Sequence, residues 1–113
     1  MTTYTVFNME DDEACQARNG LSLSEAFNLR LKRAEVTARI ERVPAGWHIV
    51  WDADDPWRLE ELPRIESRLT DELSAKREIM EQALKIPLPG SWMVMSDAEF
   101  IIGKVKRERG RLH

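Results

Sequence analysis

Few residues in this chain have the types and spacing that catalysis requires. Cys15 and His48 are its only cysteine and its only histidine before the C-terminal residue, so a thiol nucleophile would have to use His48 as its base. The acidic run Glu10–Glu13 lies just before Cys15 and disfavours the thiolate that such a nucleophile needs. We therefore predict no catalytic residues, and interpret Cys15 as a half-buried thiol and His48 as a side chain on the polar face of a strand.

Metal and cofactor chemistry has equally little support in the sequence. Asp52, Asp54 and Asp55 offer the carboxylates that Mg²⁺ or Ca²⁺ prefers, but the glycine and the distal glutamate of a calcium loop are missing. One cysteine and two histidines cannot supply a zinc cluster. The five glycines stand singly, so no glycine-rich phosphate loop is present. We predict no metal and no cofactor, and interpret the three aspartates as a solvated loop.

The basic C-terminal segment is the polar feature most suited to binding. Residues 104–113 contain five basic residues and one acidic residue. The rest of the chain therefore has 12 basic and 19 acidic residues. On a helix, Lys104, Arg107 and Arg111 would line one side, and such a stripe could contact phosphates or an acidic protein surface. Trp57, beside a proline in a loop, is the other candidate binding residue, because exposed tryptophans often anchor interfaces.

The overall composition indicates a single domain of 113 residues, 1–113, that ends in the basic helix or tail 104–113. Its 42% hydrophobic and 33% charged residues are typical of a globular protein. A lone cysteine suits a reducing compartment, and neither a secretory signal nor an apolar run long enough to span a membrane is present. We therefore expect a cytoplasmic protein that does not enter a membrane.

The elements that would position these residues begin with a strand and a helix. The β-branched and aromatic residues of Thr3–Met9 predict a strand, and Ala14–Arg18 could form a short return strand. Asn19-Gly20 then indicates a chain reversal. Ser22 and Glu25 match a capping box, which predicts a helix over Leu23–Arg33 that packs on a sheet.

Residues 36–52 alternate between apolar and polar types on both sides of Val43-Pro44-Ala45-Gly46, which predicts a β-hairpin. If Val43 pairs with Gly46, Trp47 and Trp51 share the face of Ile40 and Ile49 and are buried. A three-residue loop with a glycine bulge would turn both tryptophans toward the polar face instead. We favour the first register, because burying two large aromatic side chains outweighs the preference for a turn type.

The second half of the chain is predicted to be mainly helical. A helix could run from Pro63 or Ser67 to about Lys85, or could begin only at Thr70-Asp71-Glu72. Its apolar stripe would contain Leu62, Ile65, Leu69, Leu73, Met80 and Leu84. The short apolar segment Ser91–Met95 follows, and Ser96 with Glu99 predicts a last helix.

Together these patterns predict an α+β fold, with a small antiparallel sheet of three to five strands and helices packed on one face in the order β(β)αββα(β)α. The 20 acidic residues single out no pair for acid–base catalysis. We expect a non-enzymatic interaction or regulatory domain whose partner is another protein or a second copy of the chain, as in a homodimer. A nucleic-acid-binding accessory protein that uses the basic C-terminal helix is the alternative.

Overall fold

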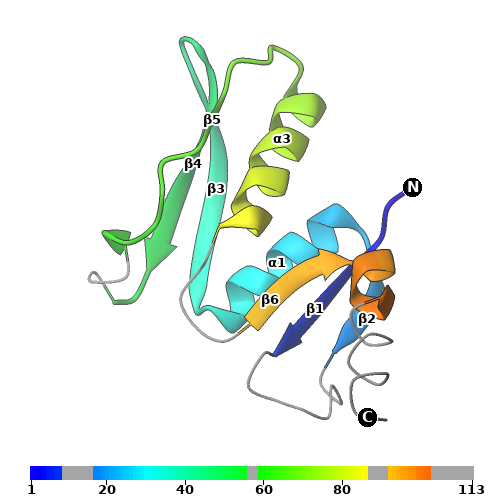
Figure 1. Ribbon diagram of the computed structural model, residues 1–113. Helices are drawn as coiled ribbons and strands as arrows, with labels where there is room; N and C mark the ends of the chain where they lie inside the picture. The colour runs from blue at the N-terminus through cyan, green and yellow to red at the C-terminus, as the bar shows by residue number, and fades with distance from the viewer. Residues whose placement is uncertain (9–16, 56–58, 87–91, 103–113) are drawn as a thin grey trace, which may run out of the picture.

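The chain folds around one helix that lies between two antiparallel sheets. The computed structural model describes residues 1–8, 17–55, 59–86 and 92–102. In these residues the first sheet has the order β2-β1-β6 and the second has the order β3-β4-β5 (Figure 1). The strands are β1 (Tyr4–Asn8), β2 (Arg18–Leu21), β3 (Val36–Val43), β4 (Gly46–Ala53), β5 (Glu66–Ser67) and β6 (Trp92–Ser96). The α+β class and approximate order are confirmed, with the strands divided between two sheets.

Helix α1 (Leu23–Arg33) packs against both sheets because different sides of the helix present apolar side chains to each of them. Ser22 and Glu25 form the predicted capping box, which fixes where the helix begins. Ala26 packs with Val6 and Leu21 in the core of the first sheet. Phe27 and Leu31 join the core of the second sheet, which also contains Ile49 and Ile65.

The hairpin of β3 and β4 has the predicted register, in which Val43 pairs with Gly46. Trp47 and Trp51 therefore pack against the core of the second sheet, and the Trp51 Nε1–H donates to the carbonyl of Pro63 at 2.8 Å. Gly46 has φ 143°, and a Cβ there would lie 2.1 Å from the carbonyl oxygen of Ser67. The turn thus needs glycine because β5 passes directly beside it.

The second helix, α3 (Glu72–Lys85), begins at the later of the two predicted positions, with Asp71 as its N-cap. The prediction of one stripe from Leu62 to Leu84 was wrong. Ile65 is buried in an extended segment, where its carbonyl accepts from the Ile49 N–H, and Leu73 on α3 is 80% exposed. The buried side of α3 is formed instead by Ala75, Ile79 and Ala83, so small residues let the helix approach the hairpin closely.

Two further predictions concern the first and last strands. Asn19-Gly20 does not reverse the chain: both residues lie in β2, where Gly20 has φ 70° and the pairing with β1 is irregular. This dipeptide therefore forms a bulge, which is the other common use of a glycine with positive φ. The segment Ser91–Met95 does contain a strand, β6, and Ser96 caps the helical residues 97–102 by accepting from the Glu99 N–H.

Candidate functional site

The structure leaves the predicted binding residues untested. Trp57 lies outside the described residues, and so do Lys104, Arg107 and Arg111. Cys15, the predicted half-buried thiol, is also outside them. The binding role of Trp57 and of the basic C-terminal residues therefore stays a prediction. A site supported by the structure has to be built from other residues.

His48 and the three aspartates are placed but do not form a reactive group. His48 lies on the outward face of β4, where its Nε2 is 3.9 Å from Glu41 Oε2. Asp52, Asp54 and Asp55 are exposed at the end of β4. Within residues 1–8, 17–55, 59–86 and 92–102, no three His, Cys, Asp or Glu side chains are grouped so that they could hold a metal ion.

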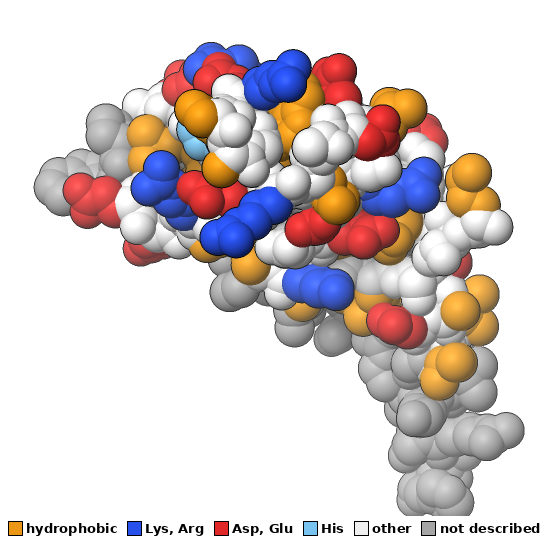
Figure 2. All heavy atoms as spheres, turned by 90° about the horizontal axis from the view of Figure 1, so that it is seen from above, with side chains coloured by type: hydrophobic (Ala, Val, Ile, Leu, Met, Phe, Trp, Pro, Cys, Tyr) orange, Lys and Arg blue, Asp and Glu red, His pale blue; other side chains and the backbone are white. Residues whose placement is uncertain are grey.

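The outward face of the second sheet is polar and of mixed charge. Arg39 Nε pairs with Glu41 Oε1 at 3.0 Å, and Arg64 Nε pairs with Glu66 Oε1 at 3.2 Å. Figure 2 shows another side of the molecule, seen from above the orientation of Figure 1, and basic and acidic side chains are interleaved there too. The outward face of the second sheet offers no field of a single sign that would attract a polyanion.

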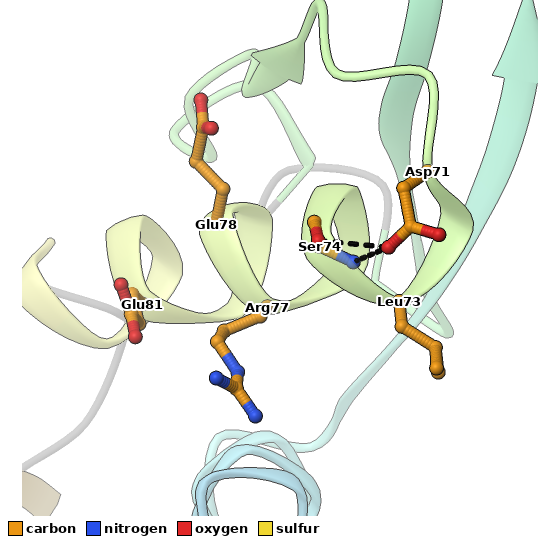
Figure 3. A pocket seen from close by; sticks show the side chains of 6 residues that line it. All are labelled: Asp71, Leu73, Ser74, Arg77, Glu78 and Glu81. Carbon is orange, nitrogen blue, oxygen red and sulfur yellow. Dashed lines mark hydrogen bonds between the residues drawn. The ribbon is translucent and has the colours of Figure 1, made fainter.

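A hollow of about 430 Å³ lies along the exposed side of α3. Figure 3 shows that its side chains diverge, with Arg77 and Glu78 pointing in opposite directions. The Asp71 carboxylate accepts from the Ser74 hydroxyl at 2.7 Å and from the Ser74 N–H at 2.9 Å. These hydrogen bonds, that of the hydroxyl first, lower the pKa of Asp71, and they are the hydrogen bonds by which Asp71 caps α3.

Asp97 fixes the end of β6 against the rest of the first sheet. Its carboxylate accepts from the hydroxyls of Thr3 and Thr5, both at 2.5 Å, and from the Gly20 N–H at 3.0 Å. The hydrogen bond from Thr3, followed by that from Thr5, lowers the pKa of Asp97. One carboxylate thus joins β1, the bulge of β2 and the beginning of helix 97–102.

The other end of β6 is held by aromatic contacts. The Arg33 guanidinium of α1 lies 4.6 Å from the centroid of the Trp92 ring, a distance at which a cation is attracted to an indole. On the opposite face of the sheet, the rings of Phe7 and Phe100 are 5.1 Å apart. The position of β6 is therefore fixed at both ends, although it pairs with β1 alone in the described residues.

The register of β6 shows which of its backbone groups point away from the sheet. The Asp97 N–H donates to the Thr3 carbonyl at 3.0 Å, and the ladder continues with Met95 opposite Thr5 and Met93 opposite Phe7. Hydrogen-bonded and non-hydrogen-bonded pairs alternate in an antiparallel ladder. The backbone N–H and C=O of Val94 therefore point away from β1, toward the edge of β6 that has no partner strand among the described residues.

A hollow of about 500 Å³ follows this edge. It separates β6 from the last turns of α3 and is bordered also by Glu99 of helix 97–102. We call it the β6 edge groove. Its apolar lining residues are Tyr4, Leu84, Met93, Val94 and Met95. Met93 exposes 40% of its surface, and Ile101 and Ile102 of the helical residues 97–102 expose 59% and 55%.

No local pattern in the sequence indicates the β6 edge groove, because the groove depends on pairing between residues 84 to 92 positions apart. The one available hint was the absence of charge in the five residues of β6.

Comparison with known proteins adds no family to this description. No family model matches the chain, and no curated protein or solved structure matches it significantly. None of the helices in the described residues has the length and the apolar character that crossing a membrane requires.

Proposed function

We propose that the chain is a non-enzymatic protein-interaction domain of the cytoplasm that binds its partner at the β6 edge groove. The observation that carries the proposal is a strand edge that has no partner strand among the described residues and lies beside a hollow. Val94 directs a backbone donor and a backbone acceptor into the groove, and such groups are a template for pairing with another chain.

The other sheet edges in the described residues support this proposal by contrast. Natural proteins protect edge strands with charge, a bulge or short length. β2 has a bulge at Gly20, β3 has Arg39, Glu41 and Arg42, and β5 is two residues long. β6 has five residues, none of them charged. A strand edge without charge, a bulge or short length is expected where the function of that edge is to pair with a strand of another protein.

A comparison of two purified proteins tests the proposal. The wild-type chain and the variant Val94→Pro, each immobilised at equal density, are incubated with lysate of the source organism. Proline removes the N–H that points into the groove and leaves the ladder with β1 intact. We expect at least one protein to bind the wild type and to be lost from the variant.

The control is Glu61→Lys, an exposed substitution outside the groove, which should retain the same protein. If the wild type retains nothing above background, the interaction function is wrong. If the proline variant retains the same proteins as the wild type, the β6 edge groove is not the binding site.

A further inference from the structure

We propose that the β6 edge groove accepts an extended, basic segment of a partner protein, which joins the first sheet as a fourth strand. This inference rests on the proposed function, since it specifies the chemistry of the partner that the same groove would bind.

The backbone of β6 requires an extended occupant. The N–H groups of Val94 and Ser96 and the carbonyls of Trp92 and Val94 point away from β1, as the alternation of the ladder dictates. A helix has no free backbone donors and acceptors along its side, whereas a strand about 4.8 Å away satisfies all four groups. Main-chain hydrogen bonds of this kind supply affinity in strand addition.

The walls of the groove suit a single chain. β6 forms one side, and the last two turns of α3, with Glu81, Leu84 and Lys85, form the other. A strand inserted between them would place alternate side chains on the two faces of the sheet. The side chains on the face toward the helices would contact Tyr4 and Leu84. Those on the other face would lie beside Met93 and Met95.

The charges at the groove select a basic occupant. Glu81 and Glu99 are both exposed at its border, and Lys85 is the one cation among its described lining residues. Neither glutamate forms a salt bridge with another described residue. A lysine or arginine on the incoming strand would compensate this excess of negative charge, while an acidic strand would be repelled.

Designed peptides test these requirements directly. The probe is a fluorescein-labelled heptapeptide in which lysine alternates with valine, and its matched control has glutamate in place of every lysine. We expect fluorescence anisotropy to show binding of the basic peptide with a Kd below about 1 mM. The acidic peptide should bind at least about tenfold more weakly, because its charge is opposed by both glutamates.

Backbone methylation of the probe distinguishes strand addition from general attraction between charges. One peptide has N-methyl groups at every valine amide and a second has them at every lysine amide, so that each blocks one edge of the strand. One of the two should lose binding and the other should retain it. If both patterns bind equally, or if neither weakens the peptide, strand addition is wrong.

Two protein variants complete the design. Glu81→Lys with Glu99→Lys should weaken the basic peptide about tenfold, and added salt should reduce this difference by screening. The control pair Glu60→Lys with Glu61→Lys, also exposed and outside the groove, changes the net charge equally and should leave binding unchanged. Equal loss in both pairs would show that net charge alone drives binding.

The failure of this inference can be distinguished from failure of the proposed function. Suppose that a lysate protein binds the wild type but not Val94→Pro, and that no basic peptide binds. The β6 edge groove is then still the binding site, but the inference that it accepts a basic strand is wrong. If light scattering shows a dimer that Val94→Pro dissociates and no peptide binds, a second copy occupies the groove, and the inference is overturned. Peptide binding that Val94→Pro abolishes supports the inference.

Discussion

Proline substitutions at adjacent positions of β6 should destabilise the fold to different extents. In the observed register the Val94 N–H points to the groove, whereas the Met95 N–H points to β1 and bonds to Thr5. Met95→Pro therefore breaks the ladder next to Thr5, which is fully buried. Val94→Pro removes a donor that has no partner in the ladder, so edge strands tolerate it.

The magnitudes follow from the burial of the affected groups. Met95→Pro loses one hydrogen bond and leaves a buried carbonyl without a donor, a cost of about 2–4 kcal/mol. Val94→Pro keeps the ladder and costs about 1 kcal/mol through the restricted φ of proline. The two variants should therefore differ by about 1–3 kcal/mol, which for a chain of this length is about 4–12 °C in Tm.

Urea unfolding followed by tryptophan fluorescence measures this difference. Val94→Ala and Met95→Ala are the controls, because subtracting each alanine variant from its proline variant removes the contribution of the lost side chain. If Val94→Pro is as destabilising as Met95→Pro after this subtraction, the Val94 N–H does not point to solvent. The backbone argument for the β6 edge groove would then be wrong.

Three other predictions concern the bulge, the turn and the C-terminal segment. Asp97→Asn should reduce the free energy of unfolding at neutral pH. The pKa of Asp97 is lower in the folded chain, so its contribution is complete above the unfolded pKa of about 4 and is lost as pH falls through the folded pKa. A wild-type-to-variant difference that does not shrink in acid would contradict this. Gly46→Ala should cost more than about 1 kcal/mol in thermal unfolding, because its Cβ would meet the Ser67 carbonyl; a neutral effect would show that β5 moves aside. If the basic segment binds nucleic acid, a gel shift with mixed DNA and RNA should weaken with salt and vanish when residues 104–113 are deleted; a shift that survives the deletion rules that segment out.

The parts of the fold that the sequence predicts correctly are those decided by neighbouring residues. Ser22 and Glu25 are three positions apart, so the capping box and the beginning of α1 follow directly from the sequence. The register of the hairpin is also local, because it depends on which face Trp47 and Trp51 occupy. In both cases the pattern that decides the structure can be read from residues close together in the sequence.

The prediction of the second-helix stripe failed for a physical reason. Leu69 and Leu73 have helical spacing relative to later leucines, but the segment before Asp71 extends to pair with β4. That segment places Ile65 in the core, while α3 buries the side that contains Ala75, Ile79 and Ala83 and leaves Leu73 exposed. Periodicity could not reveal this, because a leucine stripe has the same spacing whether a sheet or solvent lies beside it.

The composition of β6 also bears on how selective its partner recognition should be. Met93 and Met95 flank Val94 at the edge, and unbranched thioether side chains adapt to partners of different shape. Main-chain hydrogen bonds to Val94 are indifferent to the sequence of the added strand. Selectivity would then depend mainly on Glu81 and Glu99, which are exposed and screened by salt. We therefore expect the β6 edge groove to discriminate strands by charge more strongly than by the shape of their apolar side chains.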